Sequence, residues 1–173
     1  QASGDLPGQG NALNLLTYHL ADLAVLLKRL NQALAVYKAA GHVLGQGAII
    51  NNLGNAYMAL GLYRRARRLY QQAIDVAHRT GATRYVTTWN LLQLEADAGH
   101  LDAAQAYLDD YVAQYQALGL AAARPYVTFA QGQLALRRGL AAQALPQFAR
   151  AMRQLGAGNT EGRMLFLTET GRA

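Results

Sequence analysis

One spacing of small and large side chains recurs along this 173-residue chain. In residues 61–73, Ala66 is followed four positions later by Tyr70 and three positions after that by Ala73. Two antiparallel helices approach closely only where one carries a small side chain, and a large side chain one turn on fills the remaining gap. The spacing therefore predicts helices that pack in pairs. The matching positions elsewhere are Ala33, Tyr37 and Ala40; Ala104, Leu108 and Tyr111; and Ala144, Phe148 and Ala151.

Glycines mark the breaks between the helical segments. A glycine readily takes the left-handed conformation that ends a helix. No stretch alternates between apolar and polar residues as a half-buried strand would. Because one helix hairpin cannot bury its apolar faces alone, at least three must stack. The glycines near the expected breaks are Gly41, Gly45, Gly61, Gly81, Gly99, Gly119, Gly139 and Gly156.

Residues 47–80 resemble a tetratricopeptide repeat. That family has Leu-Gly-x2-Tyr in the first helix and Ala-x3-aromatic-x2-Ala in the second, and the resemblance extends more loosely over about residues 13–156. Units of this length are similar to the lengthened type found in bacterial regulators and kinesin-light-chain-like proteins. The matches are Leu53, Gly54, Tyr57, Ala66, Tyr70 and Ala73 in the second unit; Leu20, Ala33, Tyr37 and Ala40 in the first, with Ala21 for the glycine; Gly132, Ala144, Phe148 and Ala151 in the fourth, with Ala135 for the tyrosine; the third has Leu92 and Glu95 at the first-helix positions.

We therefore expect an all-α fold, a right-handed superhelical solenoid of antiparallel helix hairpins. The last segment is expected either to cap the fourth hairpin or to begin a truncated fifth one. The predicted boundaries are a disordered segment at 1–12, hairpins at about 14–46, 47–80, 83–118 and 124–156, and a capping helix or cut repeat at 159–173.

The resemblance implies that the first helices line a concave groove that binds peptides or helices. Amide side chains recur at the corresponding positions, and an amide offers two donors and two acceptor sites, which suits a peptide backbone. Aromatic side chains beside them would anchor a partner. Alternatively, the amides solvate exposed helix faces and the aromatics belong to the core. The candidate groove residues are Tyr18, His19, Asp22, Asn51, Asn52, Asn55, Trp89, Asn90, Gln93, Tyr126, Phe129 and Gln133.

The residues present disfavour a carboxylate clamp, a catalytic nucleophile and a metal site. A carboxylate clamp for chaperone C-termini would need Lys or Arg where Asp22, Asn55 and Trp89 stand. The chain has no cysteine, which removes thiolate ligands and a Cys nucleophile, and its one serine, Ser3, lies in the expected disordered segment. His19 and Asp22 are spaced as a hydrogen-bonded pair rather than a metal site. We predict no enzyme activity, no cofactor and no metal.

The chain is basic, with sixteen Lys and Arg against ten Asp and Glu and a formal net charge of +6. Such a charge permits attraction to nucleic acid or to acidic partners without specifying either. Four arginines, Arg64, Arg65, Arg67 and Arg68, stand in one predicted second helix, which the resemblance places on the convex side. Runs of this kind are usually solvated faces, and no aromatic platform accompanies this one. Nucleic acid is therefore disfavoured, with phosphate contact as the alternative.

These observations predict a non-enzymatic protein–protein interaction module that binds a peptide or helix of a partner. The resemblance implies a part of a larger bacterial regulatory protein in the cytoplasm. The sequence contains no run of eighteen apolar residues, so we expect no membrane span. Two alternatives stay open. One is a sensor for a small molecule or short signalling peptide, and the other is a self-association module that forms a homodimer through its C-terminal end.

Overall fold

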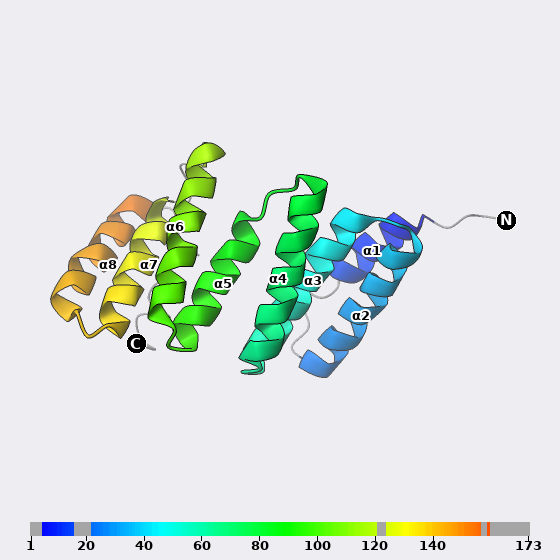
Figure 1. Cartoon of the computed structure of the whole chain (residues 1–173), viewed down its shortest axis with the longest axis horizontal. Helices are drawn as coiled ribbons and strands as arrows, with labels where there is room; N and C mark the ends of the chain where they lie inside the picture. Colours follow the sequence, from blue (N-terminus) through cyan, green and yellow to red (C-terminus); the bar gives the residue numbers. More distant parts are fainter. Residues whose placement is uncertain (1–4, 16–21, 121–123, 157–158, 160–173) are drawn as a thin grey trace. The chain divides into compact units, whose positions relative to one another are not determined.

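The computed structural model describes residues 5–15, 22–120, 124–156 and 159, and these residues form eight helices and no strand. Within each of the two compact units described below, consecutive helices run antiparallel, so the predicted all-α class of helix hairpins is confirmed (Figure 1). The predicted C-terminal helix, 159–173, lies outside the described residues apart from Asn159. In chain order the helices are α1 (Leu6–Leu15), α2 (Leu23–Ala39), α3 (Val43–Ala59), α4 (Tyr63–Thr80), α5 (Tyr85–Asp97), α6 (Leu101–Ala117), α7 (Arg124–Arg137) and α8 (Ala141–Leu155).

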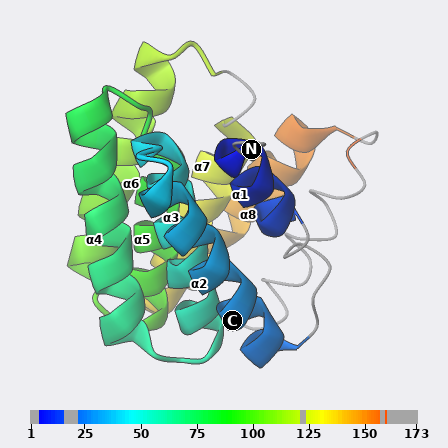
Figure 2. The ribbon, with the colours of Figure 1, turned by 90° about the vertical axis from the view of Figure 1, so that its right-hand side faces the viewer.

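The chain divides into two compact units, Gln1–Leu94 and Glu95–Ala173. In the first unit, α3 packs against α2 on one side and α4 on the other (Figure 1), and α1 lies along α2 (Figure 2). The core between α2 and α3 is built from aliphatic side chains around one aromatic ring. Its buried members are Leu30, Ala33, Tyr37, Ile49, Leu53 and Ala56.

The first alanine of each recurring spacing is fully buried. Ala33, Ala66, Ala104 and Ala144 all have an exposed fraction of 0%. This burial is consistent with the prediction that these positions are small because a neighbouring helix packs over them. A larger side chain there would force the helices apart and cost about 1–3 kcal/mol.

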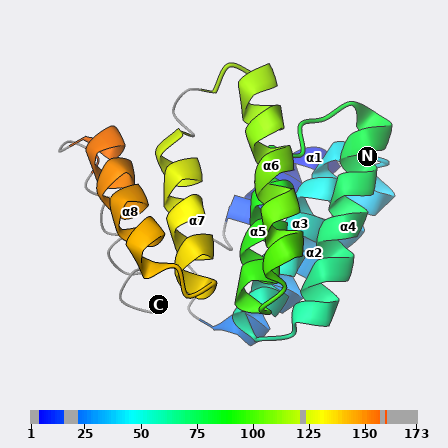
Figure 3. The ribbon, with the colours of Figure 1, turned by 60° about the vertical axis from the view of Figure 1, so that its left-hand side comes forward.

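A glycine of the first helix faces the aromatic ring of the second in two hairpins. A Cβ on Gly54 of α3 would lie 2.5 Å from Cε1 of Tyr70 on α4. In the second unit, a Cβ on Gly132 of α7 would lie 2.6 Å from Cε1 of Phe148 on α8. Real Cβ atoms do not come that close to carbon, so only glycine lets the ring lie flat against the helix. Figure 3 shows α7 and α8 running antiparallel in this way.

Left-handed glycines end the helices, as the sequence predicts. Gly61, with φ of 72°, follows α3, and Gly139, with φ of 78°, follows α7. At the first of these turns, the N–H of Leu62 donates to the carbonyl of Tyr57 at 2.9 Å, which satisfies one of the last free carbonyls of the helix. Gly45 is an exception to the prediction, because it lies inside α3, where its missing Cβ makes room for the ring of Tyr37.

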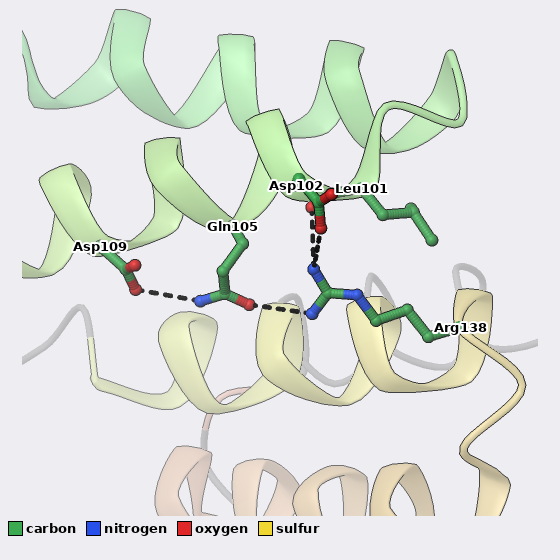
Figure 4. A network of polar contacts seen from close by, with 5 residues as sticks. All are labelled: Leu101, Asp102, Gln105, Asp109 and Arg138. Atoms are coloured by element: carbon green, nitrogen blue, oxygen red, sulfur yellow. Dashed lines mark hydrogen bonds and ion pairs between the residues drawn. The ribbon is translucent and has the colours of Figure 1, made fainter.

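Two arginines at the C-terminal end of α7, Arg137 and the following residue Arg138, contact the preceding helical residues of the second unit. Arg137 donates to the Asp97 carboxylate at 2.6 Å and to the carbonyl of Ala96 at 2.9 Å. Arg138 donates to Asp102 at 3.1 Å and reaches Gln105, which in turn donates to Asp109 at 3.0 Å (Figure 4). These pairs are exposed, and each stabilises the fold by at most about 1 kcal/mol.

The first hairpin differs from the prediction. Helix α1 occupies residues 6–15, so the expectation of a disordered segment at 1–12 is wrong for residues 6–12. Gly10, and not Ala21, faces the ring of Tyr37, since a Cβ on Gly10 would lie 2.7 Å from its Cε1 atom. Ala21 is outside the described residues. The hairpin therefore begins earlier and has a longer connection than its neighbours.

Candidate functional site

Helix α3 is the centre of the candidate site. Its sequence, VLGQGAIINNLGNAYMA, contains no charged residue, and seven of its residues are buried. A helix that is apolar or uncharged all round is one that neighbours cover on several sides. Of its polar side chains, Asn51 is buried, so its amide must be paired with polar groups nearby.

An amide network joins α3 to α1 and α5 in the first unit. The Oδ1 atom of Asn51 accepts hydrogen bonds from Thr87 Oγ1 and from Asn90 Nδ2, both at 3.0 Å. Asn51 Nδ2 donates to Oδ1 of Asn52 at 3.4 Å, and Asn52 Nδ2 donates to Oδ1 of Asn14 at 2.8 Å. Asn51 has an exposed fraction of 9%. Buried amides of this kind are stable only when hydrogen-bonded, so the network fixes the three helix faces in register.

A groove of about 270 Å³ opens beside this network. It is bounded by α3 and α4, by the start of α5 and by Asn14 of α1, all within the first unit. None of the lining residues is charged. Two exposed aliphatic residues, Leu44 and Val86, stand at its rim, with exposed fractions of 53% and 50%. The lining residues are Asn14, Leu44, Gly47, Ala48, Asn51, Asn52, Ala73, Val76, Ala77, Thr80, Ala82, Thr83, Val86 and Thr87.

A second hollow of about 190 Å³ lies on the other side of Asn52. It runs between α2 and α3 and is mostly aliphatic. Asn52 lines both hollows, so its amide group stands between two places that could receive side chains of a ligand. The lining residues are Leu23, Leu26, Leu30, Asn52, Asn55, Ala56 and Ala59.

Three of the predicted groove residues, Asn51, Asn52 and Asn90, are brought together by the amide network. Asn55 lies one turn along α3, where its Oδ1 accepts a hydrogen bond from the hydroxyl of Tyr70 at 2.7 Å. Trp89 and Gln93 are half-buried on α5. The structure therefore groups the asparagines of α3 and α5, and it assigns Asn55 a role inside its own hairpin.

The remaining predicted residues lie elsewhere. Tyr18 and His19 are outside the described residues. Asp22 is not on a first helix at all; it caps α2, accepting hydrogen bonds from the N–H groups of Ala24 and Val25. This placement corrects the register predicted for the first hairpin.

The predicted residues of α7 belong to the second unit. Phe129, with an exposed fraction of 3%, packs against Phe148 with ring centroids 5.3 Å apart. Tyr126 packs against the same small core, and Gln133 has an exposed fraction of 7%. Phe129 is therefore a packing residue of the α7–α8 hairpin, which is the alternative that the sequence left open for the aromatics.

Sequence reasoning missed Asn14 and Thr87 as members of the site. One signal could have located α1. The tripeptide Gly-Asn-Ala occurs at 10–12 and again at 54–56, and aligning the two places residues 6–15 in the register of a first helix. In both copies the asparagine accepts a hydrogen bond from the tyrosine of the second helix, Asn11 from Tyr37 at 2.6 Å and Asn55 from Tyr70 at 2.7 Å.

The electrostatics of the site do not favour acid–base chemistry. Burial raises the pKa of both Tyr37 and Tyr70, so neither hydroxyl ionises near neutral pH. In the described part of the chain, no three His, Asp or Glu side chains gather as metal ligands. Nor is any helix there long and apolar enough to cross a bilayer. The groove offers hydrogen bonds and apolar contacts.

Comparison with known proteins supports the fold. Residues 47–80 match the family model described as "Tetratricopeptide repeat", so the resemblance seen in the sequence is confirmed for this segment. No curated protein sequence matches the chain. Among solved structures, BtubC (BKLC) from P. vanneervenii is similar, with a TM-score of 0.76, 20% identity, and coverage of 92% of this chain and 68% of that one.

A second similar structure is aspartyl phosphate phosphatase F from Bacillus subtilis. Its TM-score is 0.78 at 15% identity, and the match covers 96% of this chain but only 44% of the phosphatase. The chain thus spans less than half the length of that protein. Identities this low show a shared helical-repeat fold and nothing about activity.

Proposed function

We propose that this chain is a non-catalytic protein-interaction module that binds an uncharged, extended segment of a partner in the groove bounded by α3, α4, the start of α5 and Asn14 of α1. The observation that carries the proposal is the amide network of Asn14, Asn52, Asn51 and Asn90 beside the groove. Tetratricopeptide repeats, the family matched by residues 47–80, are generally interaction modules without catalytic activity.

Asn52 is the residue best placed to contact a peptide backbone. A side-chain amide has two N–H donors and two acceptor sites. The bonds that Asn52 makes to Asn14 and Asn51 use one donor and one acceptor site. Among the described residues, the second N–H donor and the second acceptor site of Asn52 have no partner and can bond to a ligand. A peptide unit presents one donor and one acceptor, so Asn52 matches a backbone of any sequence.

The rim of the groove adds apolar contact. Leu44 and Val86 are about half exposed and would be covered by an aliphatic side chain of the partner. Burial of apolar surface stabilises a complex by about 25 cal/mol per Å². Because no charged residue lines the groove, a charged side chain would lose its hydration without gaining a partner. The segment bound here is therefore uncharged over the residues that enter the groove.

A small-molecule sensor is the competing proposal, because the groove volume of about 270 Å³ is close to the lower end of the range of about 300–1,000 Å³ that is usual for ligand pockets. An extended segment needs no deep enclosure. We further propose that the module belongs to a larger bacterial regulatory protein in the cytoplasm, since it spans only part of both similar bacterial proteins.

The test is selection of binders from a random peptide library displayed on phage, with the affinity of the selected peptides then measured for variants. One variant carries Leu44→Asp and Val86→Asp, which place charges at the groove rim. Its control carries Val43→Asp and Leu140→Asp, which change residues of similar exposure outside the groove. All four substitutions fall at a helix cap or first turn, where a carboxylate is favourable, so both variants should fold.

We expect the groove variant to lose about tenfold or more in affinity and the control to stay within about twofold. We also expect the selected peptides to be uncharged and rich in aliphatic residues. Equal affinities for both variants would show that the peptides bind elsewhere and would refute the groove as the partner site. A library that yields no binder, together with a melting-temperature increase from a small-molecule collection, would favour the sensor instead.

A further inference from the structure

The formal net positive charge of this protein belongs to one of its two units. Residues 1–94 contain nine Lys and Arg against three Asp, which accounts for the whole formal charge of +6. Residues 95–173 contain seven Lys and Arg against seven Asp and Glu, so their formal charge is zero. Such an asymmetry creates a field that draws an acidic partner to the first unit.

The charge of the first unit is densest on α4, in the run Arg64-Arg65-Ala66-Arg67-Arg68. The buried Ala66 and Tyr70 fix the rotation of this helix, since both have an exposed fraction of 0%. Arg64, Arg65 and Arg68 are consequently exposed. With 3.6 residues per turn, Arg64 and Arg68 lie roughly opposite Ala73 and Ala77, two of the four α4 residues that line the groove. Arg65 is on the same side of α4 as the lining residue Val76 but about three turns before it, so the arginines stand apart from the groove.

Arg64 and Arg68 make no ion pair or hydrogen bond with the described residues. The one acidic residue on α4 is Asp75, two to three turns away from Arg64 and Arg68. Arg65 lies over the ring of Tyr57, 4.1 Å from its centroid. The second unit offers a contrast, because Arg137 is paired there with the Asp97 carboxylate. Arg138 is paired with the Asp102 carboxylate (Figure 4). The charges on α4 are not used to hold the fold together.

The location of the arginines opposes helix formation. Arg64 and Arg65 lie in the first turn of α4, the end of a helix that repels positive charge. The residue before that turn, Leu62, makes no side-chain capping hydrogen bond, and the turn contains no acidic residue. Folding alone would favour the reverse arrangement. A bound carboxylate group would neutralise the arginines and supply the negative charge that this helix end lacks.

Exposed leucines adjoin the arginines and indicate what kind of anion fits. Leu60 and Leu62, in the turn before α4, have exposed fractions of 43% and 48%. Nucleic acid would need aromatic faces for stacking or a track of positive charge along the surface. Here Arg65 covers the ring of Tyr57, and the next arginine on α4 after the run, Arg79, follows about three turns later. Guanidinium groups beside leucines match carboxylates beside aliphatic side chains.

We propose that Arg64, Arg65 and Arg68, with Leu60 and Leu62, form a second protein-binding surface that takes an acidic, leucine-containing segment of a partner. This surface is separate from the groove and does not depend on it. Binding there combines bidentate guanidinium–carboxylate pairs with burial of two leucines.

The probe is a fluorescein-labelled synthetic peptide of repeated Glu-Glu-Leu triplets, titrated with the full chain and followed by fluorescence anisotropy. A peptide of Gln-Gln-Leu triplets and a single-stranded and a double-stranded oligonucleotide of mixed sequence serve as comparison ligands. The test variant is Arg64→Gln with Arg68→Gln. Its control is Arg150→Gln with Arg153→Gln, which removes two exposed arginines from α8 in the second unit and changes the net charge equally.

We expect the test variant to bind the Glu-Glu-Leu peptide about tenfold more weakly or worse, and the control to bind as the parent chain does. The parent's affinity should also fall steeply with salt, and less steeply for the test variant. Equal losses in both variants would mean that only net charge matters and would overturn the proposal. So would the absence of binding, or oligonucleotides that bind more tightly than the peptide and depend on the same arginines. An unaltered melting temperature, or a higher one, shows that the test variant is folded.

Discussion

The hairpins α1–α2 and α3–α4 make the same contact with different lengths of chain. In each, a tyrosine of the second helix lies flat on a glycine of the first, and its hydroxyl donates to the asparagine that follows the glycine. The pairs are Tyr37 on Gly10 and Tyr70 on Gly54. Tyr37 follows its glycine by 27 residues, whereas Tyr70 follows its glycine by 16. The same contact therefore forms across two different lengths of chain.

The two hairpins also differ at the start of the second helix. Asp22 caps α2, and its carboxylate accepts from two backbone N–H groups. Helix α4 starts without such a cap and with arginines in its first turn. In the first hairpin, a side chain of the chain itself therefore accepts from the first N–H groups of the second helix. In the second hairpin, no capping side chain does so, and a carboxylate of a ligand could take that place.

Removal of the tyrosine rings should lower the free energy of unfolding more than any other change to the two hairpins. Tyr70→Ala should lower the free energy of unfolding by about 3–5 kcal/mol, because it empties a fully buried site. Tyr37→Ala should cost a similar amount if the two contacts are equivalent, and urea denaturation followed by circular dichroism measures both. Tyr63→Ala, at a half-buried position on α4, is the control and should cost much less. Equal losses at Tyr63 and Tyr70 would contradict the packing described here.

Substitution of the facing glycines should have the next largest effect. Alanine is the better helix former by about 1 kcal/mol, yet Gly54→Ala and Gly10→Ala would place a Cβ 2.5 Å and 2.7 Å from a ring carbon. We expect overpacking to prevail and both variants to lose about 1–3 kcal/mol. Gly8→Ala is the comparison on α1: its Cβ would meet the Asp5 carboxylate and no ring, so any loss would come from the hydrogen bond that Asp5 accepts from the N–H of residue 8. Stabilisation by Gly54→Ala would show that the ring has room to withdraw.

The sequence predicted the hairpins that share one internal spacing. The aromatic residue follows the glycine by 16 positions in both α3–α4 and α7–α8, and there the expected alanine and glycine positions lie where the structure has them. The same spacing applied to the first hairpin selected Ala21 and Asp22, which was wrong because the connection after α1 is longer. Periodicity within helices carries no information about loop length. The repeated Gly-Asn-Ala tripeptide did carry it.

The candidate site was predicted only in part. Asn51, Asn52 and Asn90 were found from the register of the first helices, and the structure joins them in one network. Phe129 was assigned to the groove by the same register and lies in a core instead. A first helix is covered by its own partner helix on one side and by the next hairpin on another, so apolar periodicity does not separate its groove face from its buried faces.

Removing the capping residue of α2 and adding one to α4 tests the difference between the two helix starts. Asp22→Ala should destabilise the chain by about 1 kcal/mol, since two N–H groups of α2 lose their acceptor. Leu62→Asp should stabilise it by up to about 1 kcal/mol, because it supplies both a cap and a negative charge beside Arg64 and Arg65. Thermal unfolding of the two variants measures both changes. Destabilisation by Leu62→Asp would mean that Leu62 contributes to packing more than its exposure indicates.

The smallest expected effect concerns the tyrosine hydroxyls. Tyr70→Phe keeps the ring and removes the hydrogen bond to Asn55, so at neutral pH it should cost about 1 kcal/mol. Tyr37→Phe, which loses the bond to Asn11, should cost about the same. Urea denaturation at neutral pH gives both values. A clear inequality would show that the two hairpins share a geometry without sharing its energetics.

At alkaline pH, Tyr70→Phe should become more stable than the parent chain instead of less stable. Burial raises the pKa of Tyr70, whereas in the unfolded chain a tyrosine titrates near 10. Above about pH 10 the unfolded state therefore releases a proton that the folded state retains, and the stability of the parent chain falls as the pH rises. Tyr70→Phe has no proton to release at this position and escapes that part of the loss. Denaturation midpoints at neutral pH and at about pH 11 should converge and then cross; midpoints that decline in parallel would mean that the hydroxyl of Tyr70 reaches water in the folded protein.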